Sequence, residues 1–270
     1  MSVLLLRLAG PLQAWGSASR FARRGTENAP TKSGVVGLLA AASGRGREGD
    51  VSDLAALRFG VRIDQPGMRL RDFHTAHHAD SNRAMPLSDR FYLADAVFLA
   101  AVEGDARLLQ QLYEALLAPH FLPYLGRRSC PPSRPVTIGP PQEATLEEAL
   151  TETAWQAARW YAEQRRAREG ARETASPGPE LDILIDCAPT DAPDFTLRDV
   201  PLSFDPRHRR FGPRGVRGSR SGLGPPRSAP QAAPHDPTSV LPPATGSPSS
   251  PLPSGTTDTT PPESGLPRID

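Results

Sequence analysis

Residues 3–8 read VLLLRL, an apolar run that predicts a buried strand ended by Gly10 and Pro11. A loop rich in glycine, arginine and serine follows. The apolar spacing then predicts a helix from about Ser33 to Ala42. A strand followed by a helix is the opening of a βαβ unit.

The next segments continue this order of elements. Residues 57–64 alternate apolar and charged side chains, which predicts a half-buried strand, and a second strand is predicted over residues 91–102. A helix follows, with Asp105 as its N-cap and Leu117 near its end. The order strand, helix, strand, insertion, strand, helix predicts an α+β fold of the split βαβ, ferredoxin-like type. Residues 136–138 are the candidate fourth strand.

Composition divides the chain into parts. Beyond residue 222, Pro, Ser, Thr and Gly dominate and no periodic apolar pattern remains, so residues 223–270 are predicted to be a disordered tail. We expect a ferredoxin-like domain over residues 1–140, with an insertion at about 66–90. A small C-terminal region is expected over residues 141–222.

Within that C-terminal region, Thr145 and Glu148 form a capping box that predicts a helix continuing to Tyr161. Residues 181–185 are the last clear strand. Residues 205–221 are the densest basic run, which indicates either contact with nucleic acid or a disordered basic flank.

Charge and cysteine content exclude several classes of protein. The net charge is only +1. Of the 31 basic residues, Lys32 is the single lysine and the others are arginines. Cys130 and Cys187 lie far apart and form no CxxC pair, so neither a disulfide framework nor a zinc site is expected. No run approaches the ~20 apolar residues of a membrane span. A cytoplasmic protein without cofactor, metal or membrane attachment is predicted.

The loop before the first helix is a candidate anion site. Arg20 and Lys32 approach a predicted helix start at Ser33, where free backbone N–H groups favour negative charge. An ordinary surface loop with a helix cap is the alternative. A P-loop is excluded, because Pro30 and Thr31 stand where that motif needs glycine and lysine.

Residues 124–132 read YLGRRSCPP and form the sharpest local signal. Arg127, Arg128 and Ser129 follow a glycine and precede two prolines, which suits a rigid loop that contacts phosphates. A rigid connection with exposed arginines is the alternative. Cys130 has no histidine and acid partner in sequence and is predicted to be a small buried residue.

A histidine cluster lies in the insertion. His74, His77 and His78 have spacings that suit metal ligation, but Asp80 is the only acidic neighbour, which favours a solvated loop over a metal site. His74 alone is a candidate general base for RNA cleavage.

Four blocks of sequence, in order, resemble one known family. They are residues 6–16 (LRLAGPLQAWG), 30–39 (PTKSGVVGLL), 71–75 (RDFHT) and 124–131 (YLGRRSCP). Together they resemble the CasD-type RAMP subunits of type I-E CRISPR Cascade complexes. The similarity covers residues 3–140 well and is absent from the tail.

The resemblance implies a RAMP-type, ferredoxin-like fold with an inserted β-hairpin thumb. It implies a non-catalytic subunit that binds the 5′ handle of the CRISPR RNA in antiviral defence. Its implied partners are the Cascade backbone subunits and the large subunit, with target DNA met only through the complex. A metal-independent endoribonuclease that processes precursor CRISPR RNA is the alternative, since relatives in another subtype cut that RNA.

Roles follow for individual residues on this reading. Trp15 is expected to stack on a base or to support its loop, or else to be a core residue. Arg20, Lys32, Arg127 and Arg128 are assigned to phosphates. Ser33 and Ser129 are expected to donate hydrogen bonds, and His74 is a further RNA-binding candidate. In the alternative, His74 is the base, assisted by Tyr92 or Tyr124.

Overall fold

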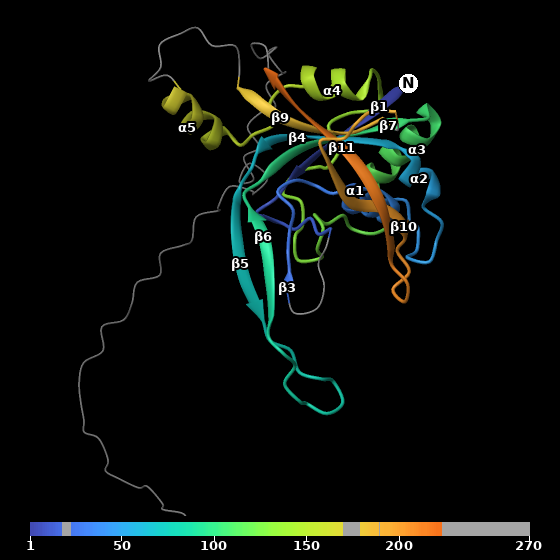
Figure 1. Cartoon of the computed structure of the whole chain (residues 1–270), viewed down its shortest axis with the longest axis vertical. Coiled ribbons are helices and arrows are strands. Elements are labelled where there is room, and N and C mark those ends of the chain that lie inside the picture. Colours follow the sequence, from blue (N-terminus) through green and yellow to red (C-terminus); the bar gives the residue numbers. More distant parts are fainter. Residues whose placement is uncertain (18–22, 170–178, 189, 223–270) are drawn as a thin grey trace, which may run out of the picture. The chain divides into compact units, whose positions relative to one another are not determined.

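The structure is a computed structural model that describes residues 1–17, 23–169, 179–188 and 190–222, all within one unit, Met1–Ala229 (Figure 1). The predicted tail, residues 223–270, lies outside the described residues. The elements in chain order are β1 (Ser2–Ala9), β2 (Leu12–Gln13), β3 (Arg23–Arg24), α1 (Lys32–Ala42), α2 (Ser52–Ala56), β4 (Arg58–Gln65), β5 (Met68–His74), β6 (Ser88–Ala94), β7 (Val97–Gly104), α3 (Ala106–Leu117), β8 (Gln142–Glu143), α4 (Leu146–Glu152), α5 (Arg159–Glu169), β9 (Glu180–Asp186), β10 (Phe195–Ser203) and β11 (Arg210–Gly222).

Seven antiparallel strands form the main sheet of the described residues, in the order β10-β11-β9-β4-β7-β1-β8. The predicted early elements are present: β1, α1, β4 and α3 lie where the sequence placed them. The position beside β1 is taken by β8, and residues 136–138 contribute only an isolated bridge from Thr137 to Leu6. Strands β9, β10 and β11 extend the sheet beyond β4, so the sheet crosses the boundary expected at residue 140.

Helices cover both faces of the main sheet. Leu4, Leu6 and Leu8 of β1 share a buried cluster with apolar side chains of α1 and α3. Val3 and Leu5 point the other way and pack with α4. A strand that is buried on both faces reads as a continuous apolar run, which explains the pattern of residues 3–8.

Strand β4 is also covered on both faces, so the half-buried prediction for residues 57–64 is wrong. Phe59 and Val61 face α1 and α3, while Arg62 faces α4 and is fully buried. Arg62 donates to the backbone oxygens of Leu150 (2.5 Å), Thr153 (2.7 Å) and Ala154 (3.0 Å) at and beyond the end of α4. Its charge is balanced by the equally buried Asp64, with 2.7 Å between Nε and Oδ1.

The single strand predicted over residues 91–102 is two strands in two sheets. Strand β6 ends at Ala94, Asp95 adopts a left-handed φ of 55°, and β7 then enters the main sheet at Val97. The second sheet contains β2, β6 and β3 in that order, with β5 paired to β6. Since no Gly or Pro marks the break at Asp95, the sequence reads as one continuous apolar strand.

Strands β5 and β6 form the hairpin of the second sheet and project from the body (Figure 1). Every residue of the connecting segment 75–87 is exposed. The hairpin occupies the predicted insertion, between β4 and β7. It carries five exposed large apolar side chains: Met68, Leu70, Phe73, Met85 and Leu87.

The helix predicted from Thr145 to Tyr161 is also two elements. Its capping box is present at Thr145 and Glu148, but α4 ends at Glu152 and α5 begins at Arg159. The segment between them is held against the end of β4: Trp155 donates its Nε1–H to the backbone oxygen of Asp64 (2.9 Å). These contacts to β4 replace the helical hydrogen bonds that the local pattern predicts. Among the described residues, no helix is long and apolar enough to cross a membrane.

The basic run at residues 205–221 is mostly strand, which contradicts the disordered flank, one of the two alternatives left open for it. Residues 210–222 form β11, which pairs with β10 on one side and β9 on the other. Arg217 and Arg220 of β11 form ion pairs with Asp191 and Asp182. Glycines and arginines dominate β11, so no period-2 apolar pattern marks it as a strand.

Candidate nucleic-acid interface

The N-terminus of α1 is not an open anion site. Thr31 caps the helix by accepting a hydrogen bond from the Gly34 N–H (3.3 Å). The backbone N–H of Lys32 donates to Oδ2 of Asp199 at 2.8 Å, so a carboxylate of β10 already occupies the anion position. The site that the loop and the helix start predicted is thus filled from within the protein.

Lys32 and Ser33 are therefore corrected as RNA-binding candidates. The Lys32 side chain is 8% exposed and forms an ion pair with Asp186 (2.9 Å). Ser33 is buried, and its hydroxyl lies 3.4 Å from that of Thr31. Neither side chain is placed to reach a phosphate, because Lys32 is held by Asp186 and Asp199 and Ser33 is buried beside Thr31. Of the strands that follow residue 180, β9 corresponds to the strand predicted over residues 181–185, whereas β10 and β11 were not predicted.

Arg214 completes a buried charge cluster with Lys32, Asp186 and Asp199. Its guanidinium donates to both oxygens of Asp199 and to Asp186, each at 2.8 Å, and lies 5.3 Å from the ring centroid of Phe59. The carboxylates hold the pKa of Arg214 above its ordinary value against the opposing effect of burial, which is the largest single influence. Two cations and two carboxylates balance here, and the cluster joins β9, β10 and β11 to α1.

Trp15 is a core residue that supports its loop, and the base-stacking role is corrected. Its side chain is 1% exposed, and its Nε1–H donates to Oε1 of Gln13 (3.1 Å). A Cβ on Gly34 would lie 2.7 Å from the indole ring, so the helix packs directly against it. The Trp15 backbone N–H donates to Thr26 Oγ1 (2.9 Å), which holds the loop toward the second sheet.

The 124–132 loop approaches the second sheet through Arg127. Its turn requires glycine: Gly126 has a φ of 82°, and a Cβ there would overlap the Ala14 backbone oxygen. Arg127 Nη2 donates to the backbone oxygen of Arg24 (2.9 Å), and the guanidinium lies 4.7 Å from the Tyr92 ring centroid. Its Nη1 is shielded and has no hydrogen-bond partner among the described residues.

Arg128 and Ser129 are exposed beside it. Cys130 follows as a fully buried residue, which confirms the prediction made for it. Arg20 lies outside the described residues, and its assignment stays an expectation.

Further arginines surround β6. Arg23 lies 5.2 Å from the Phe91 ring centroid, and Arg69 donates to Oδ1 of Asn28 (2.7 Å). The pleat places Arg90 on the face of β6 that carries Tyr92, whereas Phe91 lies on the other. Arg90 Nε is shielded without a hydrogen-bond partner among the described residues. The β6 arginine cluster, as we call it, comprises Arg23, Arg24, Arg69, Arg90, Arg127 and Arg128.

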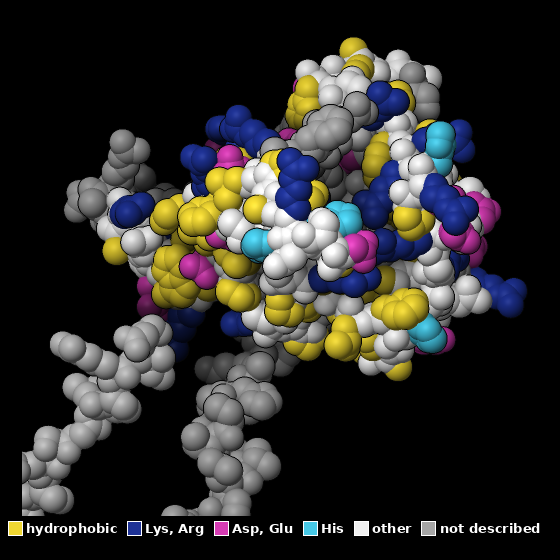
Figure 2. Space-filling model, turned by 90° about the horizontal axis from the view of Figure 1, so that it is seen from below, with side chains coloured by type: hydrophobic (Ala, Val, Ile, Leu, Met, Phe, Trp, Pro, Cys, Tyr) yellow, Lys and Arg dark blue, Asp and Glu magenta, His cyan; other side chains and the backbone are white. Residues whose placement is uncertain are grey.

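The β6 arginine cluster combines cations with aromatic rings. Guanidinium groups suit phosphates through their planar fork of donors and also stack on rings and bases. Arg69 and Arg90 were missed from the sequence, because their positions beside the other arginines depend on the strand register. Figure 2, seen from the side toward which the β5–β6 hairpin projects, shows arginine side chains interspersed with hydrophobic and histidine side chains.

A family model described as CRISPR-associated protein (Cas_Cas5) matches residues 3–217. The chain belongs to the Cas5 family. The "CRISPR system Cascade subunit CasD" of Escherichia coli (strain K12) is 38% identical over 170 residues, 55% of this chain and 75% of that protein. The family predicted from the four sequence blocks is confirmed.

Solved structures agree with this assignment. A crystal structure of a Cas protein has 38% identity and a TM-score of 0.61, and the match covers 83% of this chain and all (100%) of that chain. A chain of a CRISPR RNA-guided surveillance complex has 32% identity and a TM-score of 0.68, over 82% of this chain and 91% of its own.

In this Cas5 chain, His74 stands apart from Tyr92, one of the two tyrosines named with it for catalysis. Its Nε2 lies 2.7 Å from Oδ2 of Asp72, and its register partner is Ser88. Tyr92 pairs with Leu70, which lies four residues before His74 on β5, a separation of about 13 Å along the strand. Tyr92 is also 3% exposed and lies beneath Arg127. The expectation that Tyr92 assists His74 is therefore wrong.

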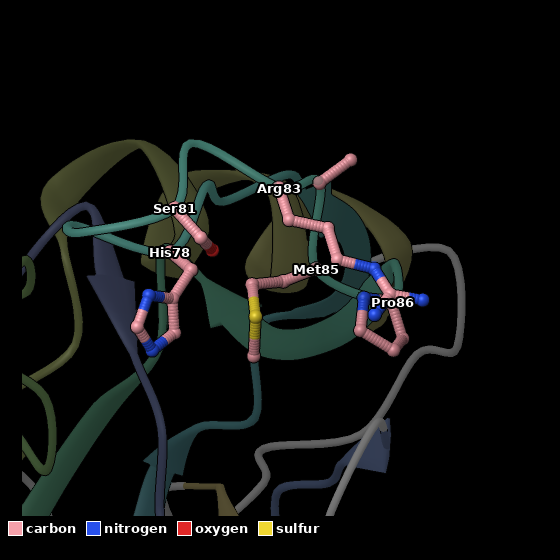
Figure 3. A pocket seen from close by; sticks show the side chains of 6 residues that line it. His78, Ser81, Arg83, Met85 and Pro86 are labelled. Carbon is pink, nitrogen blue, oxygen red and sulfur yellow. The ribbon is translucent and has the colours of Figure 1, made fainter.

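The outer end of the β5–β6 hairpin carries a cavity of about 560 Å³, lined by His78, Ser81, Arg83, Ala84, Met85 and Pro86. The side chains of His78 and Met85 extend in the same direction from the loop, and Arg83 reaches toward Pro86 (Figure 3). Among the described residues, no group of three His, Cys, Asp or Glu side chains is placed to hold a metal ion.

The two cysteines of the Cas5 chain are expected to react differently with iodoacetamide. Burial raises the pKa of the Cys130 thiol, and its side chain is 0% exposed, whereas Cys187 is partly exposed. Because the thiolate is the reactive form, we expect modification of Cys187 alone in the folded protein and of both in urea. Peptide mass spectrometry after brief labelling measures this. Equal labelling of Cys130 in the folded chain would contradict the packing of the 124–132 loop.

Proposed function

We propose that this Cas5 chain is a non-catalytic subunit of a type I-E Cascade surveillance complex that binds and caps the 5′ handle of the CRISPR RNA. The observation that carries the proposal is Arg127, which lies on Tyr92, donates to the Arg24 oxygen and keeps one shielded nitrogen without a partner among the described residues. Single-stranded RNA is bound through cations and stacked rings. The similarity to a chain of a CRISPR RNA-guided surveillance complex supports CRISPR RNA as the class of RNA.

The strand arrangement supports a RAMP-type, ferredoxin-like assignment. In the ferredoxin-like fold two βαβ units interlock, so that the fourth, first, third and second strands lie side by side. Strands β8, β1, β7 and β4 lie in that order, with α1 after β1 and α3 after β7. The β5–β6 hairpin is then the thumb, inserted between the second and third strands of this unit.

Exposed apolar residues on the thumb support packing against a neighbouring subunit. Met68, Phe73 and Leu87 are 74%, 66% and 53% exposed. Exposed apolar surface of this kind, set among arginines, is typical of an interaction site. We infer that the neighbours are the Cascade backbone subunits and the large subunit, that target DNA is met in the complex, and that the complex is cytoplasmic.

The position of His74 supports a binding role over catalysis. RNA cleavage through the 2′-hydroxyl needs a base, an acid for the leaving oxygen and cations on the phosphate. His74 has Asp72 as its neighbour, whereas Arg127 of the β6 arginine cluster lies over Tyr92. A metal-independent endoribonuclease remains the second candidate, because the Asp72 carboxylate can orient the imidazole.

One gel assay tests the proposal. Labelled repeat-containing RNA incubated with the purified chain is expected to stay intact and to form a shifted complex, with or without divalent metal, and His74→Ala is expected to behave like the wild type. Specific cleavage at the base of the repeat stem that His74→Ala abolishes would establish the endoribonuclease. A lack of any shifted complex at low salt would count against the RNA-binding proposal itself.

A further inference from the structure

The turn between β10 and β11 carries a compact group of cations. Arg207, His208, Arg209 and Arg210, here called the turn cluster, are consecutive and all exposed. Asp205 is the only acidic residue of the turn. Its carboxylate accepts a hydrogen bond from the Arg207 backbone N–H (2.8 Å) instead of pairing with a guanidinium.

The turn cluster differs from the arginines that follow it in β11. Arg214, Arg217 and Arg220 each form an ion pair with a carboxylate. The side chains of the turn cluster form no hydrogen bond or ion pair with any described residue. The basic run thus contains three arginines that hold the sheet together and a group of cations that remains available to a ligand.

The turn is held rigidly at its base. The Asp205 backbone N–H donates to Ser203 Oγ (3.2 Å), and the His208 backbone N–H donates to the backbone oxygen of Asp205 (3.0 Å). The buried cluster around Arg214 fixes the two strands to α1. A rigid base limits where the three guanidinium groups can lie, so less conformational entropy is lost when they bind a ligand.

Neither phenylalanine ring at the turn is free to stack on a base, and the imidazole of His208 is the one exposed aromatic ring among the described residues of the turn. Phe204 packs edge-on against Phe211 (6.3 Å between centroids), and its ring would lie 3.6 Å from a Cβ on Gly37 of α1. Both rings are partly buried. The β6 arginine cluster, by contrast, has Tyr92 and Phe91 beneath its guanidiniums.

We propose that the turn cluster binds the phosphate backbone of double-stranded nucleic acid. A duplex presents phosphates outward and keeps its bases stacked inside, so closely spaced guanidinium groups suit it. Single strands also rely on stacking successive bases on several rings, whereas the turn offers only the imidazole of His208. The turn cluster is therefore a second site, which takes a different ligand from the handle site and stands even if that site fails its own test.

The test compares two variants of the full chain with equal loss of charge. Arg207→Ala/Arg209→Ala/Arg210→Ala removes the turn cations, and Arg159→Ala/Arg166→Ala/Arg168→Ala removes three from α5. Fluorescence anisotropy with a random DNA duplex, an RNA hairpin stem and unstructured single-stranded RNA is measured over a salt series. We expect the turn variant to bind duplexes about tenfold or more weakly than the wild type. The slope of log K against log salt should fall by about two to three, because each phosphate contact with a duplex contributes ~0.9 to it.

The outcomes separate the ligands. If the turn variant loses affinity for the DNA duplex, for the RNA stem or for both, the proposal is supported and the kind of duplex is identified, provided its affinity for single-stranded RNA changes less than about threefold. An equal loss of affinity for single-stranded RNA, an equal loss in the α5 variant, or unchanged affinity for both duplexes overturns the proposal. Unchanged melting temperatures show that both variants are folded. Arg207→Lys/Arg209→Lys/Arg210→Lys, which keeps the charge, should bind duplexes within about threefold of the wild type.

Discussion

Replacing Arg62 with alanine is expected to lower the free energy of unfolding by about 3–5 kcal/mol, the cost of leaving a buried ion without its partner. Arg62 is fully buried and is the hydrogen-bond partner of Asp64 and of three backbone oxygens at and beyond the end of α4. Its removal leaves the buried Asp64 carboxylate without its countercharge and with the Gln156 N–H as its remaining donor, and it takes the Arg62 donor from the Leu150 and Thr153 oxygens. Urea unfolding followed by far-UV circular dichroism measures the change.

Arg71→Ala is the matched control, on β5. The Arg71 side chain is 67% exposed and pairs with Asp89 at the surface, where an ion pair contributes about 1 kcal/mol or less. A loss of unfolding free energy for Arg62→Ala no larger than that for Arg71→Ala would contradict the role given to Arg62.

The effect of Arg62→Ala should also depend on pH. Burial raises the pKa of Asp64, and the Arg62 guanidinium opposes that rise. Without Arg62, the Asp64 carboxyl should bind its proton at a higher pH in the folded chain than in the unfolded chain. A raised folded pKa stabilises the protein at low pH, and this stabilisation is lost as the pH rises through the folded value. The difference in the free energy of unfolding between Arg62→Ala and the wild type is therefore expected to be smaller at pH 5 than at pH 7.

Replacing Arg127 and Arg128 together with alanine is expected to weaken binding of the handle RNA and to flatten its salt dependence. Removing one phosphate interaction with a single strand lowers the slope of log K against log salt by about 0.7, so the slope of the double variant should fall by about 1.4. Arg127 also positions the Arg24 backbone and covers Tyr92, so the melting temperature of the variant is measured in parallel.

Arg217→Ala/Arg220→Ala removes the same charge from β11, where both side chains already have carboxylate partners. This control should keep the wild-type slope within about 0.3. Equal slopes for the two double variants would contradict the assignment of the 124–132 loop to phosphates. Arg127→Lys separates charge from the planar fork of donors.

Local patterns predicted the first elements of the fold correctly. The apolar run at residues 3–8, the N-cap at Asp105 and the capping box at Thr145 are all present as predicted. Each of these depends on side chains within a few residues of one another. The Cas5 family could likewise be predicted, because four blocks in a fixed order are far more specific than any single block.

What the sequence missed depends on long-range contacts. The break at Asp95 follows from a change of sheet, and the end of α4 follows from hydrogen bonds that Trp155 and its neighbours make to the end of β4. Strands β10 and β11 lack an apolar alternation and are held by the charge cluster of Arg214.

The sequence drew attention to the 124–132 loop, whose Arg127 lies beside β6, but also to buried residues. Lys32 stands at a helix start, and nothing near it in sequence indicates that Asp199 and Asp186, more than 150 residues later, bind it. Arg127 and Arg128 belong to a turn whose geometry Gly126 sets locally, so their loop could be recognised. Arg69 and Arg90 could be assigned only once the β5–β6 register was known.

Site-specific cross-linking tests the central claim most directly. CRISPR RNA carrying 4-thiouridine at single positions of the 5′ handle is assembled with this chain and the other subunits of its complex, irradiated, and digested for peptide mass spectrometry. The account predicts adducts in peptides that contain residues 23–28, 88–94 or 124–130, and none in these peptides when the label is placed at the 3′ end. Handle adducts confined to other parts of the chain or to other subunits, or equal adducts from the 3′ end, would contradict it.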